Sequence, residues 1–168
     1  MRWIWIDKFI EFESGVRATA IKNVSLAEEH LHDHFPGWPV MPASLILEGM
    51  AQTAGILVGE ARNFEEKVIL AKVKRARFFR EVRPGQQIRH EAVIERIAPE
   101  AATTTGKSFV DGEPLAEIDI VFSHIDNNLS GMTFPEENFV FTDDFKSLLR
   151  MYNLASTGGK PTDQTPPK

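Results

Sequence analysis

The chain has 168 residues, of which 42% are hydrophobic and 26% charged, values that are ordinary for a globular protein with one core. The formal net charge is −5, which gives no electrostatic reason to expect a nucleic-acid partner, and the absence of cysteine excludes disulfides and thiol catalysis. No stretch approaches the ~20 apolar residues of a membrane span, and charge interrupts the N-terminus too early for a signal peptide. We therefore expect a cytoplasmic protein with no membrane span.

The first half of the chain predicts a strand followed by one long buried helix. Residues 16–24 alternate loosely between apolar and polar, which is typical of a strand. A polar stretch with three histidines and a Pro/Gly cluster from Pro36 to Pro42 follow, and Pro42 suits the first turn of a helix. Residues 43–61 contain no proline and carry apolar side chains on nearly every side, as a buried helix does.

The second half predicts antiparallel strands. Asp111-Gly112 is the strongest hairpin signal, and Pro84-Gly85 marks another turn. In the last strand Ile118, Ile120 and Phe122 alternate with more polar residues and give one apolar face. The expected strands cover residues 68–73, 88–97, 103–110 and 115–124. One apolar helix among hairpin-connected strands predicts an α+β fold in which a sheet wraps the helix.

The sequence divides into a domain over residues 1–124 and an extension over residues 125–168. The extension begins as a loop, and Thr142 suits the N-cap of a short helix over residues 142–152. From about residue 156 the composition is rich in Gly, Pro, Thr and Lys, which predicts a disordered tail. The extension could cover a cleft, extend an oligomer interface or do neither.

Glu48 is the first candidate for chemistry. It lies one turn after Ser44 and one turn before Gln52, so the three polar side chains share a stripe on an otherwise apolar helix. Apolar surroundings favour the neutral form of a carboxyl group, which suits a proton donor. The alternative is that Glu48 marks only the wet edge of the helix.

His34 is the second candidate. It precedes a Phe-Pro-Gly turn that leads into the same helix, so a neutral imidazole and a carboxylic acid could meet in one cleft as base and acid. The spacing does not establish that geometry, and a histidine beside a turn is often structural or simply exposed.

The run from His34 to Pro42, His-Phe-Pro-Gly-Trp-Pro-Val-Met-Pro, is followed by Leu-Glu-Gly-Met-Ala-Gln over residues 47–52. This pair of motifs closely resembles the 3-hydroxyacyl-acyl-carrier-protein dehydratases of the FabZ type, whose pattern is H-F-P-G-x-P-V-M-P-G and then E-A-M-A-Q. Residues 72–85 and 106–112 are also similar. The resemblance covers roughly residues 5–124 and leaves the extension outside.

The resemblance implies a hotdog fold and a homodimer joined sheet edge to sheet edge, which families of this type often assemble into trimers of dimers. It implies that His34 of one subunit removes the C2 proton of a 3-hydroxyacyl thioester and that Glu48 of the other protonates the departing C3 hydroxyl. The product is a trans-2-enoyl thioester, formed without a cofactor from a substrate carried on acyl carrier protein. Glutamate rather than aspartate at position 48 favours dehydration without isomerisation.

The resemblance also assigns supporting roles. The backbone N–H groups of Gly37 and Ala43 are expected to bind the thioester carbonyl, and Gln52 to support Glu48. Two positions depart from the family pattern, since Ala43 replaces a usual Gly and Gly49 a usual Ala. A Cβ at Ala43 could narrow the pocket or conflict with a positive φ, whereas Gly49 could return space at a cost of about 1 kcal/mol in helix propensity. These departures bear on chain-length preference and rate.

Three further patterns have two interpretations each. His30, His32 and His34 have strand-like spacing that could present three rings to a metal, but no carboxylate or cysteine cluster completes a shell and we expect no metal site. A basic cluster is either a solvated strand edge or, as we favour, a docking surface for acyl carrier protein; it comprises Lys72, Lys74, Arg75, Arg77, Arg80 and Arg83. Several apolar side chains either line an acyl tunnel or belong to the core, namely Leu45, Ile46, Met50, Phe78 and Phe79.

Two other functions fit the expected fold. A hotdog thioesterase would use a helix carboxylate to activate water, but it leaves the His-Phe-Pro-Gly turn unexplained. A non-catalytic acyl-carrier-binding or assembly subunit would not need both His34 and Glu48.

Overall fold

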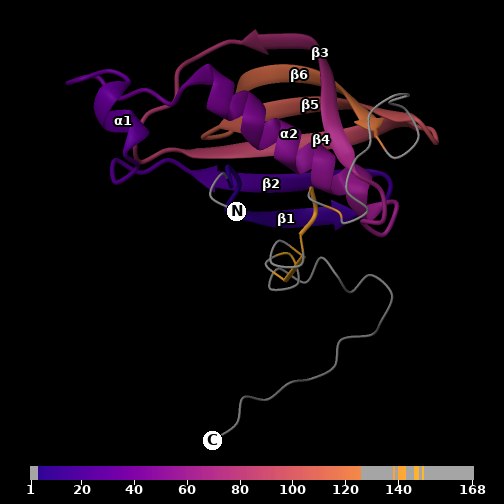
Figure 1. The fold of residues 1–168 in the computed structure, drawn as a ribbon. Helices are drawn as coiled ribbons and strands as arrows, with labels where there is room; N and C mark the ends of the chain where they lie inside the picture. Colours follow the sequence, from indigo (N-terminus) through magenta and orange to yellow (C-terminus); the bar gives the residue numbers. More distant parts are fainter. Residues whose placement is uncertain (1–3, 126–137, 139, 143–145, 148, 150–168) are drawn as a thin grey trace, which may run out of the picture.

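The computed structural model describes residues 4–125, 138, 140–142, 146–147 and 149. Six strands and two helices make up this part of the chain (Figure 1). The strands are β1 (Lys8–Glu13), β2 (Arg17–Asn23), β3 (Val68–Phe78), β4 (Gln87–Ile97), β5 (Ala101–Val110) and β6 (Glu113–His124). The helices are α1 (His30–Asp33) and α2 (Ala43–Glu60).

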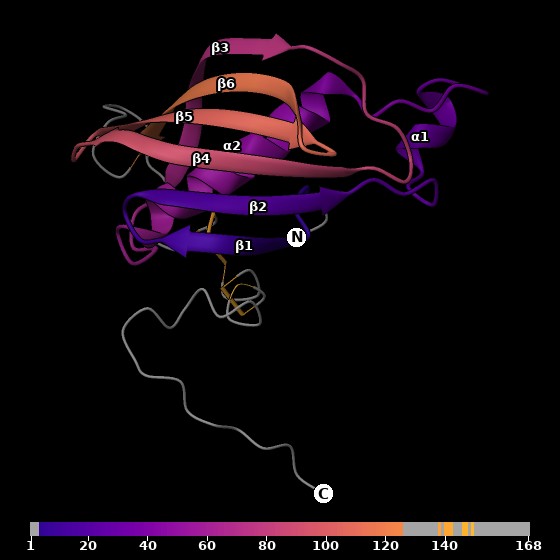
Figure 2. The ribbon, with the colours of Figure 1, turned by 180° about the vertical axis from the view of Figure 1, so that it is seen from behind.

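The strands form one antiparallel sheet in the order β1-β2-β4-β5-β6-β3. Helix α2 crosses one face of this sheet, and the view from behind shows the strands covering it (Figures 1 and 2). This arrangement confirms the α+β hotdog fold expected from the sequence. Strand β3 is an edge strand, because it pairs with β6 alone within the described residues.

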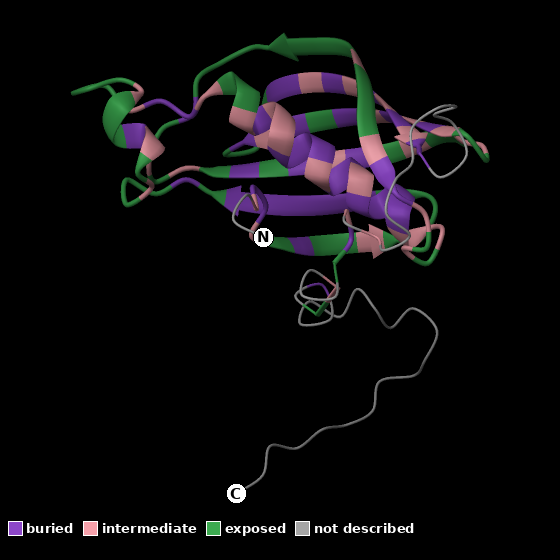
Figure 3. Cartoon of the chain, viewed as in Figure 1, coloured by how far each residue is buried: buried purple, intermediate pink, exposed green. Residues whose placement is uncertain are grey.

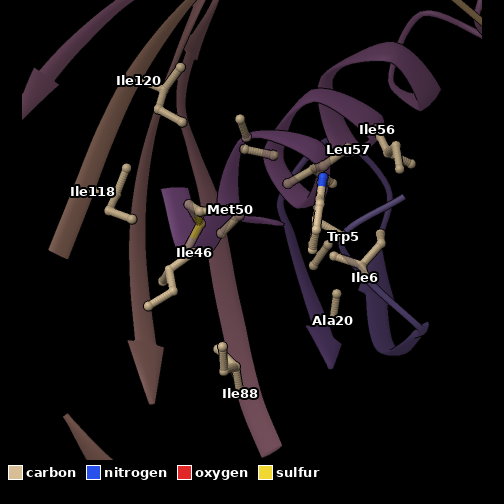
Figure 4. Close-up of a cluster of buried hydrophobic side chains, with 14 of the residues drawn as sticks. Trp5, Ile6, Ala20, Ile46, Met50, Ile56, Leu57, Ile88, Ile118 and Ile120 are labelled. Carbon is tan, nitrogen blue, oxygen red and sulfur yellow. The ribbon is translucent and has the colours of Figure 1, made fainter. Parts of the chain in front are cut away.

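Helix α2 is the centre of the core. Most of its residues from Ile46 to Gly59 are buried, whereas its first two residues are exposed (Figure 3). Ile46, Met50 and Leu57 pack among side chains of the sheet and of the N-terminal segment (Figure 4). The helix approaches the sheet closely at Gly106 of β5, where a Cβ would collide with the Met50 sulfur. The prediction of a helix buried on nearly every side is confirmed.

The hairpin predicted at Asp111-Gly112 joins β5 to β6. Asp111 has φ 52° and Gly112 has φ 83°, so both central residues adopt the left-handed conformation of a two-residue turn that matches strand twist. The predicted apolar face of β6 is also confirmed, since Ile118 and Ile120 are fully buried and Phe122 is 2% exposed.

The structure corrects three expectations. Strand β1 was not predicted, because a bulge between Phe9 and Glu11 disturbs the alternation of its side chains. Strand β3 extends to Phe78 rather than ending at residue 73, since two bulges and an exposed edge hide its pattern. The histidine-rich stretch forms the short helix α1 and not an extended segment.

A few residues of the extension are described. Phe141 and Leu149 are buried and join the core cluster. Residues 146, 147 and 149 are helical, and the Lys146 N–H donates to the Thr142 carbonyl. The remainder of the helix expected over residues 142–152, and the tail expected from residue 156, lie outside the described residues. Within the described ranges, no helix is both long and apolar enough to cross a membrane.

Candidate active site

His34 lies in the turn that joins α1 to α2. Its Nδ1 lies 2.8 Å from the carbonyl oxygen of Val40, which can only accept a hydrogen bond, so Nδ1 carries the proton. In the neutral ring Nε2 is then unprotonated and able to accept a proton. The turn itself is closed by paired backbone hydrogen bonds between Phe35 and Trp38, and Gly37 takes the left-handed φ of 74° that it requires.

The N-terminus of α2 presents unpaired backbone donors. Pro42 occupies the N-cap position and provides no side-chain cap. In the part of the chain that the structure describes, the N–H groups of Ala43 and Ser44 have no acceptor. Ala43 has no positive φ, so the Ala that replaces the usual Gly adds no backbone strain. Such N–H groups at a helix N-terminus suit a carbonyl oxygen that develops negative charge.

Glu48 is half-buried and is oriented by a chain of two hydrogen bonds. The Gln52 Nε2 donates to Glu48 Oε1 at 3.0 Å, and the backbone N–H of Trp5 donates to Gln52 Oε1 at 2.8 Å. Because that N–H must meet an oxygen, the Trp5 backbone fixes which way the Gln52 amide faces. Gln52 therefore orients Glu48, and the N-terminal segment in turn orients Gln52.

Glu48 and Gln52 open into a cavity of about 310 Å³ with largely apolar walls. Helix α2 contributes one wall through Glu48, Ala51, Gln52, Gly55 and Ile56. Val68, Leu70 and Phe122 of β3 and β6 contribute another, and Val140 and Phe141 of the extension complete the lining. None of the five apolar residues considered from the sequence lines this cavity. Ile46 and Met50 belong to the core, and Phe78 and Phe79 are exposed.

His34 and Glu48 have different partners in the described part of the chain. His34 is not among the residues that line the cavity, and no hydrogen bond or ion pair joins it to Glu48 in the described residues. Each of the two candidate groups thus has its own orienting contact.

The substitution at Gly49 has a structural explanation. The space that an alanine Cβ would take lies 2.6 Å from Nε2 of His90 and 3.0 Å from the carbonyl oxygen of Trp5. His90 is buried on β4, and its Nδ1 lies 2.8 Å from the Ser108 hydroxyl oxygen. Gly49 therefore faces the sheet, and the expectation that it returns space to the pocket is wrong. Burial lowers the pKa of His90 to about 3, so the ring is neutral near pH 7.

The three histidines of the possible metal motif each have a different partner. His30 packs edge-on against the Trp5 ring, His32 Nε2 lies 2.8 Å from the Leu26 carbonyl, and His34 is held by Val40. Among the described residues, no group of three or more potential metal ligands occurs.

The basic cluster occupies β3 and the loop after it, and all six side chains are exposed. Arg75 pairs with Glu117 and Asp119, whereas Arg80 and Arg83 lie near Glu113 and Glu81. Lys72, Lys74 and Arg77 pair with no carboxylate in the described ranges; Arg77 lies over the Phe79 ring. Arg83 also lies 3.7 Å from the centre of the exposed Trp38 ring, beside the His34 turn.

Sequence reasoning missed two contributions to the site. The role of Trp5 is carried by its backbone N–H, which no side-chain pattern reveals. Val140 and Phe141 belong to the extension, which has no counterpart in the motif.

A family model described as the FabA-like domain matches residues 3–119. A 3-hydroxyacyl-[acyl-carrier-protein] dehydratase FabZ from Thermomicrobium roseum is 40% identical over 125 residues, which cover 74% of this chain and 84% of the relative. The protein of that name from Thiobacillus denitrificans is 42% identical over 123 residues, covering 71% of this chain and 85% of the relative.

Solved structures with low identity share the fold. One is the dehydratase heterocomplex ApeI:P from Xenorhabdus doucetiae, with a TM-score of 0.62 and 14% identity over 74% of this chain and 85% of that one. Another is a hypothetical thioesterase with coenzyme A from Streptococcus pneumoniae, with a TM-score of 0.55 and 4% identity over 69% of this chain and 83% of that one. Because dehydratase and thioesterase neighbours both match, the fold does not distinguish the two activities.

The contact between Gly49 and His90 predicts a coupled effect on stability. Gly49→Ala is expected to lower the free energy of unfolding by about 1–3 kcal/mol through overpacking, although alanine favours a helix by about 1 kcal/mol. In a His90→Ala background the same substitution should cost at least about 1 kcal/mol less, because the ring that it meets is gone. Urea unfolding of the four proteins measures this coupling, and an equal cost in both backgrounds would contradict it.

The buried His90 also predicts a pH dependence. Its pKa is lowered from 6.5 to about 3 in the folded protein, so between these values the unfolded chain binds a proton that the folded chain does not. Stability due to this residue is therefore present above pH 6.5 and is lost as the pH falls, by about 2 kcal/mol between pH 7 and pH 5. Urea unfolding of the wild type and of His90→Asn at pH 7 and pH 5 tests this loss. The difference in the free energy of unfolding between the two pH values should be about 2 kcal/mol smaller in His90→Asn than in the wild type. An equal difference in both proteins would show that other groups cause it.

Proposed function

The chain belongs to the FabA-like family, and we propose that it dehydrates 3-hydroxyacyl thioesters to trans-2-enoyl thioesters in fatty-acid or related lipid biosynthesis. The observation that carries this proposal is the orientation of two groups in the family motif. His34 has its Nδ1 proton held by a carbonyl and its Nε2 open, and Glu48 is aligned by the amide of Gln52. Identity of about 40% with named dehydratases favours this activity over thioester hydrolysis.

In the proposed reaction His34 is the base. Its Nε2 takes the proton from C2 of the substrate, and the electron pair left on C2 forms the new double bond to C3. The hydrogen bond from Nδ1 to the Val40 carbonyl stabilises the imidazolium that results, because a ring with both nitrogens protonated remains a donor at Nδ1.

Glu48 is the proposed acid. Its carboxyl group gives a proton to the C3 hydroxyl, the C3–O bond breaks and water leaves. The imidazolium of His34 and the carboxylate of Glu48 then return to their starting forms by a net proton transfer through water. Gln52 holds one carboxyl oxygen by donating to it, which leaves the other oxygen to face the substrate.

Charge also develops on the thioester oxygen when the C2 proton leaves. The N–H groups of Ala43 and Gly37 are the proposed donors to this oxygen. Ala43 begins α2, where the helix dipole favours negative charge, and its N–H has no acceptor among the described residues. A donor preorganised in this way typically contributes 10²–10³-fold to the rate.

We propose that each active site uses two subunits, with His34 from one and Glu48 from the other. This arrangement is supported by the cavity beside Glu48, which His34 of the same chain does not line. Strand β3 is an eleven-residue edge with mostly exposed side chains, which suits pairing with the same strand of a second copy about a two-fold axis. Further assembly into a trimer of dimers is the larger state that we propose.

The proposed macromolecular partner is acyl carrier protein, whose acidic surface would meet the basic cluster on β3 and the following loop. A cation without a carboxylate partner, such as Arg77, would form an ion pair with the carrier protein without giving up one in its own chain. A cytoplasmic location agrees with this pathway and completes the proposal.

Purified protein should convert a 3-hydroxyacyl thioester to the trans-2-enoyl product without forming free acid or a cis-3-enoyl product. His34→Ala and Glu48→Gln should each lower kcat by at least about 10³-fold, because each removes one proton-transfer group. If the site is shared between subunits, mixing the two inactive variants under subunit exchange should restore about a quarter of the wild-type activity. Half of randomly formed dimers are mixed, and each mixed dimer has one intact site.

Mixed dimers also provide the decisive control. His34→Ala mixed with the double variant His34→Ala/Glu48→Gln produces no dimer with an intact shared site and should stay inactive. If the first mixture also stayed inactive while mass spectrometry showed mixed dimers, the two groups would act within one chain. Release of free acid by the wild type would favour the thioesterase.

Docking is tested by charge reversal. Arg77→Glu/Arg80→Glu should raise KM for carrier-bound substrate at least about tenfold and leave KM for a pantetheine thioester unchanged, because only the carrier protein meets the reversed charges. Arg96→Glu is the matched control, since Arg96 is an exposed cation on β4 outside the cluster. An unchanged KM for the carrier-bound substrate in the double variant would place docking elsewhere.

A further inference from the structure

The cavity beside Glu48 is closed partly by residues that lie outside the family match. The FabA-like match ends at residue 119, whereas Val140 and Phe141 line the cavity together with Gly55 and Ile56 of α2. These two residues therefore add a wall that the motif does not account for. Figure 1 shows this described stretch of the extension beside α2.

The Phe141 ring packs directly against the backbone of α2 at Gly59. A Cβ at Gly59 would lie 2.5 Å from Cζ of Phe141, so any residue larger than glycine at position 59 would collide with the ring. The Phe64 ring packs edge-on against it, with centroids 5.0 Å apart. Phe141 is 5% exposed, which shows that this contact buries the ring.

Asn138 anchors the same stretch by its side-chain amide. Its Nδ2 donates to the carbonyls of Phe64 and Glu66, at 3.1 and 3.3 Å, and its Oδ1 accepts from the N–H groups of Val140 and Phe141, at 3.0 and 2.9 Å. One amide thus ties the extension to the loop after α2 and fixes the backbone of both lining residues.

The wall lies at the end of the cavity that is distant from the acid. Glu48, Gln52, Gly55 and Gly59 recur at helical spacing on one side of α2. Gly59 lies about 16 Å along the axis from Glu48. The stripe is polar at Glu48 and Gln52 and has no side chain at Gly55 and Gly59, where the rings of Phe122 and Phe141 cover it. A chain bound with its reacting carbons at Glu48 would extend toward Phe141.

We propose that Val140 and Phe141 form the end wall of the acyl-binding cavity and limit the length of the acyl chain that the enzyme accepts. This inference rests on the proposed function, because it assigns the acyl part of a 3-hydroxyacyl thioester to the cavity. Each methylene that finds room in such a cavity gains about fourfold in binding, and the gain stops at a wall.

The test compares substrates of different length within each variant. The readout is the ratio of kcat/KM for 3-hydroxyhexadecanoyl-pantetheine to that for 3-hydroxybutanoyl-pantetheine, so a general loss of activity cancels. Phe141→Ala should raise this ratio at least about tenfold, as two or more further methylenes become buried. Val140→Phe should lower it, since a larger side chain moves the wall toward Glu48.

Phe9→Ala is the matched control. Phe9 is a buried phenylalanine with a ring contact to Phe12, but it does not line the cavity. It should lose stability as Phe141→Ala does and keep the wild-type ratio. Ratios within twofold of wild type in both Phe141→Ala and Val140→Phe would overturn the proposal. If Phe141→Ala does not fold, Val140→Phe decides alone, with an unchanged ratio overturning it.

A failure of the proposed function gives a different result. If the wild type dehydrates no substrate, the wall is tested by calorimetric binding of saturated acyl-pantetheine thioethers of increasing length. The affinity should rise with length to a limit in the wild type and continue to rise in Phe141→Ala. If the wild type and Phe141→Ala showed the same dependence of affinity on chain length, the proposed end wall would be wrong. If they differed as expected but the protein dehydrated no substrate, only the proposed dehydratase activity would be wrong.

Discussion

Helix α2 is buried on nearly every side, and this constraint decides where chemistry can occur. A buried helix can carry polar side chains only where a cavity or a partner receives them. Glu48 and Gln52 meet this condition by facing a cavity, and Gly55 and Gly59 continue their stripe toward the end of the helix under aromatic rings. Glu48 therefore has few alternatives for orientation: Gln52 holds one oxygen, and the backbone of Trp5 holds Gln52.

The turn that carries His34 has contacts of its own, separate from those that orient Glu48. It is held by the Val40 carbonyl and by the backbone pairing of Phe35 with Trp38. Both the open N–H groups at the start of α2 and the unpaired edge of β3 lie at the surface of the chain. The shared site that we propose would use both features, with the β3 edges paired and the N–H groups turned toward the substrate.

Much of the fold could be predicted because its local patterns are strong. The apolar run over residues 43–61 and the Asp111-Gly112 turn depend on short-range chemistry, and α2 and the hairpin are confirmed. Strands β1 and β3 were missed or shortened because bulges disturb the period on which strand prediction depends. In the site, the pairing of Gln52 with Glu48 followed from helical spacing. The contributions of Trp5 and Phe141 depend on tertiary contacts that no spacing encodes.

Gly49 shows how a departure from a motif should be interpreted. Successive residues of a helix are separated by about 100° around its axis, so Gly49 cannot share the face of Glu48 although it is adjacent in sequence. Its missing side chain makes room for His90, and the exchange concerns the core. Gly59 does share that face, three turns further on, and its missing side chain makes room for Phe141 of the extension. Of the two glycines, only the one outside the motif supports Phe141, the residue that we propose limits the length of the acyl chain.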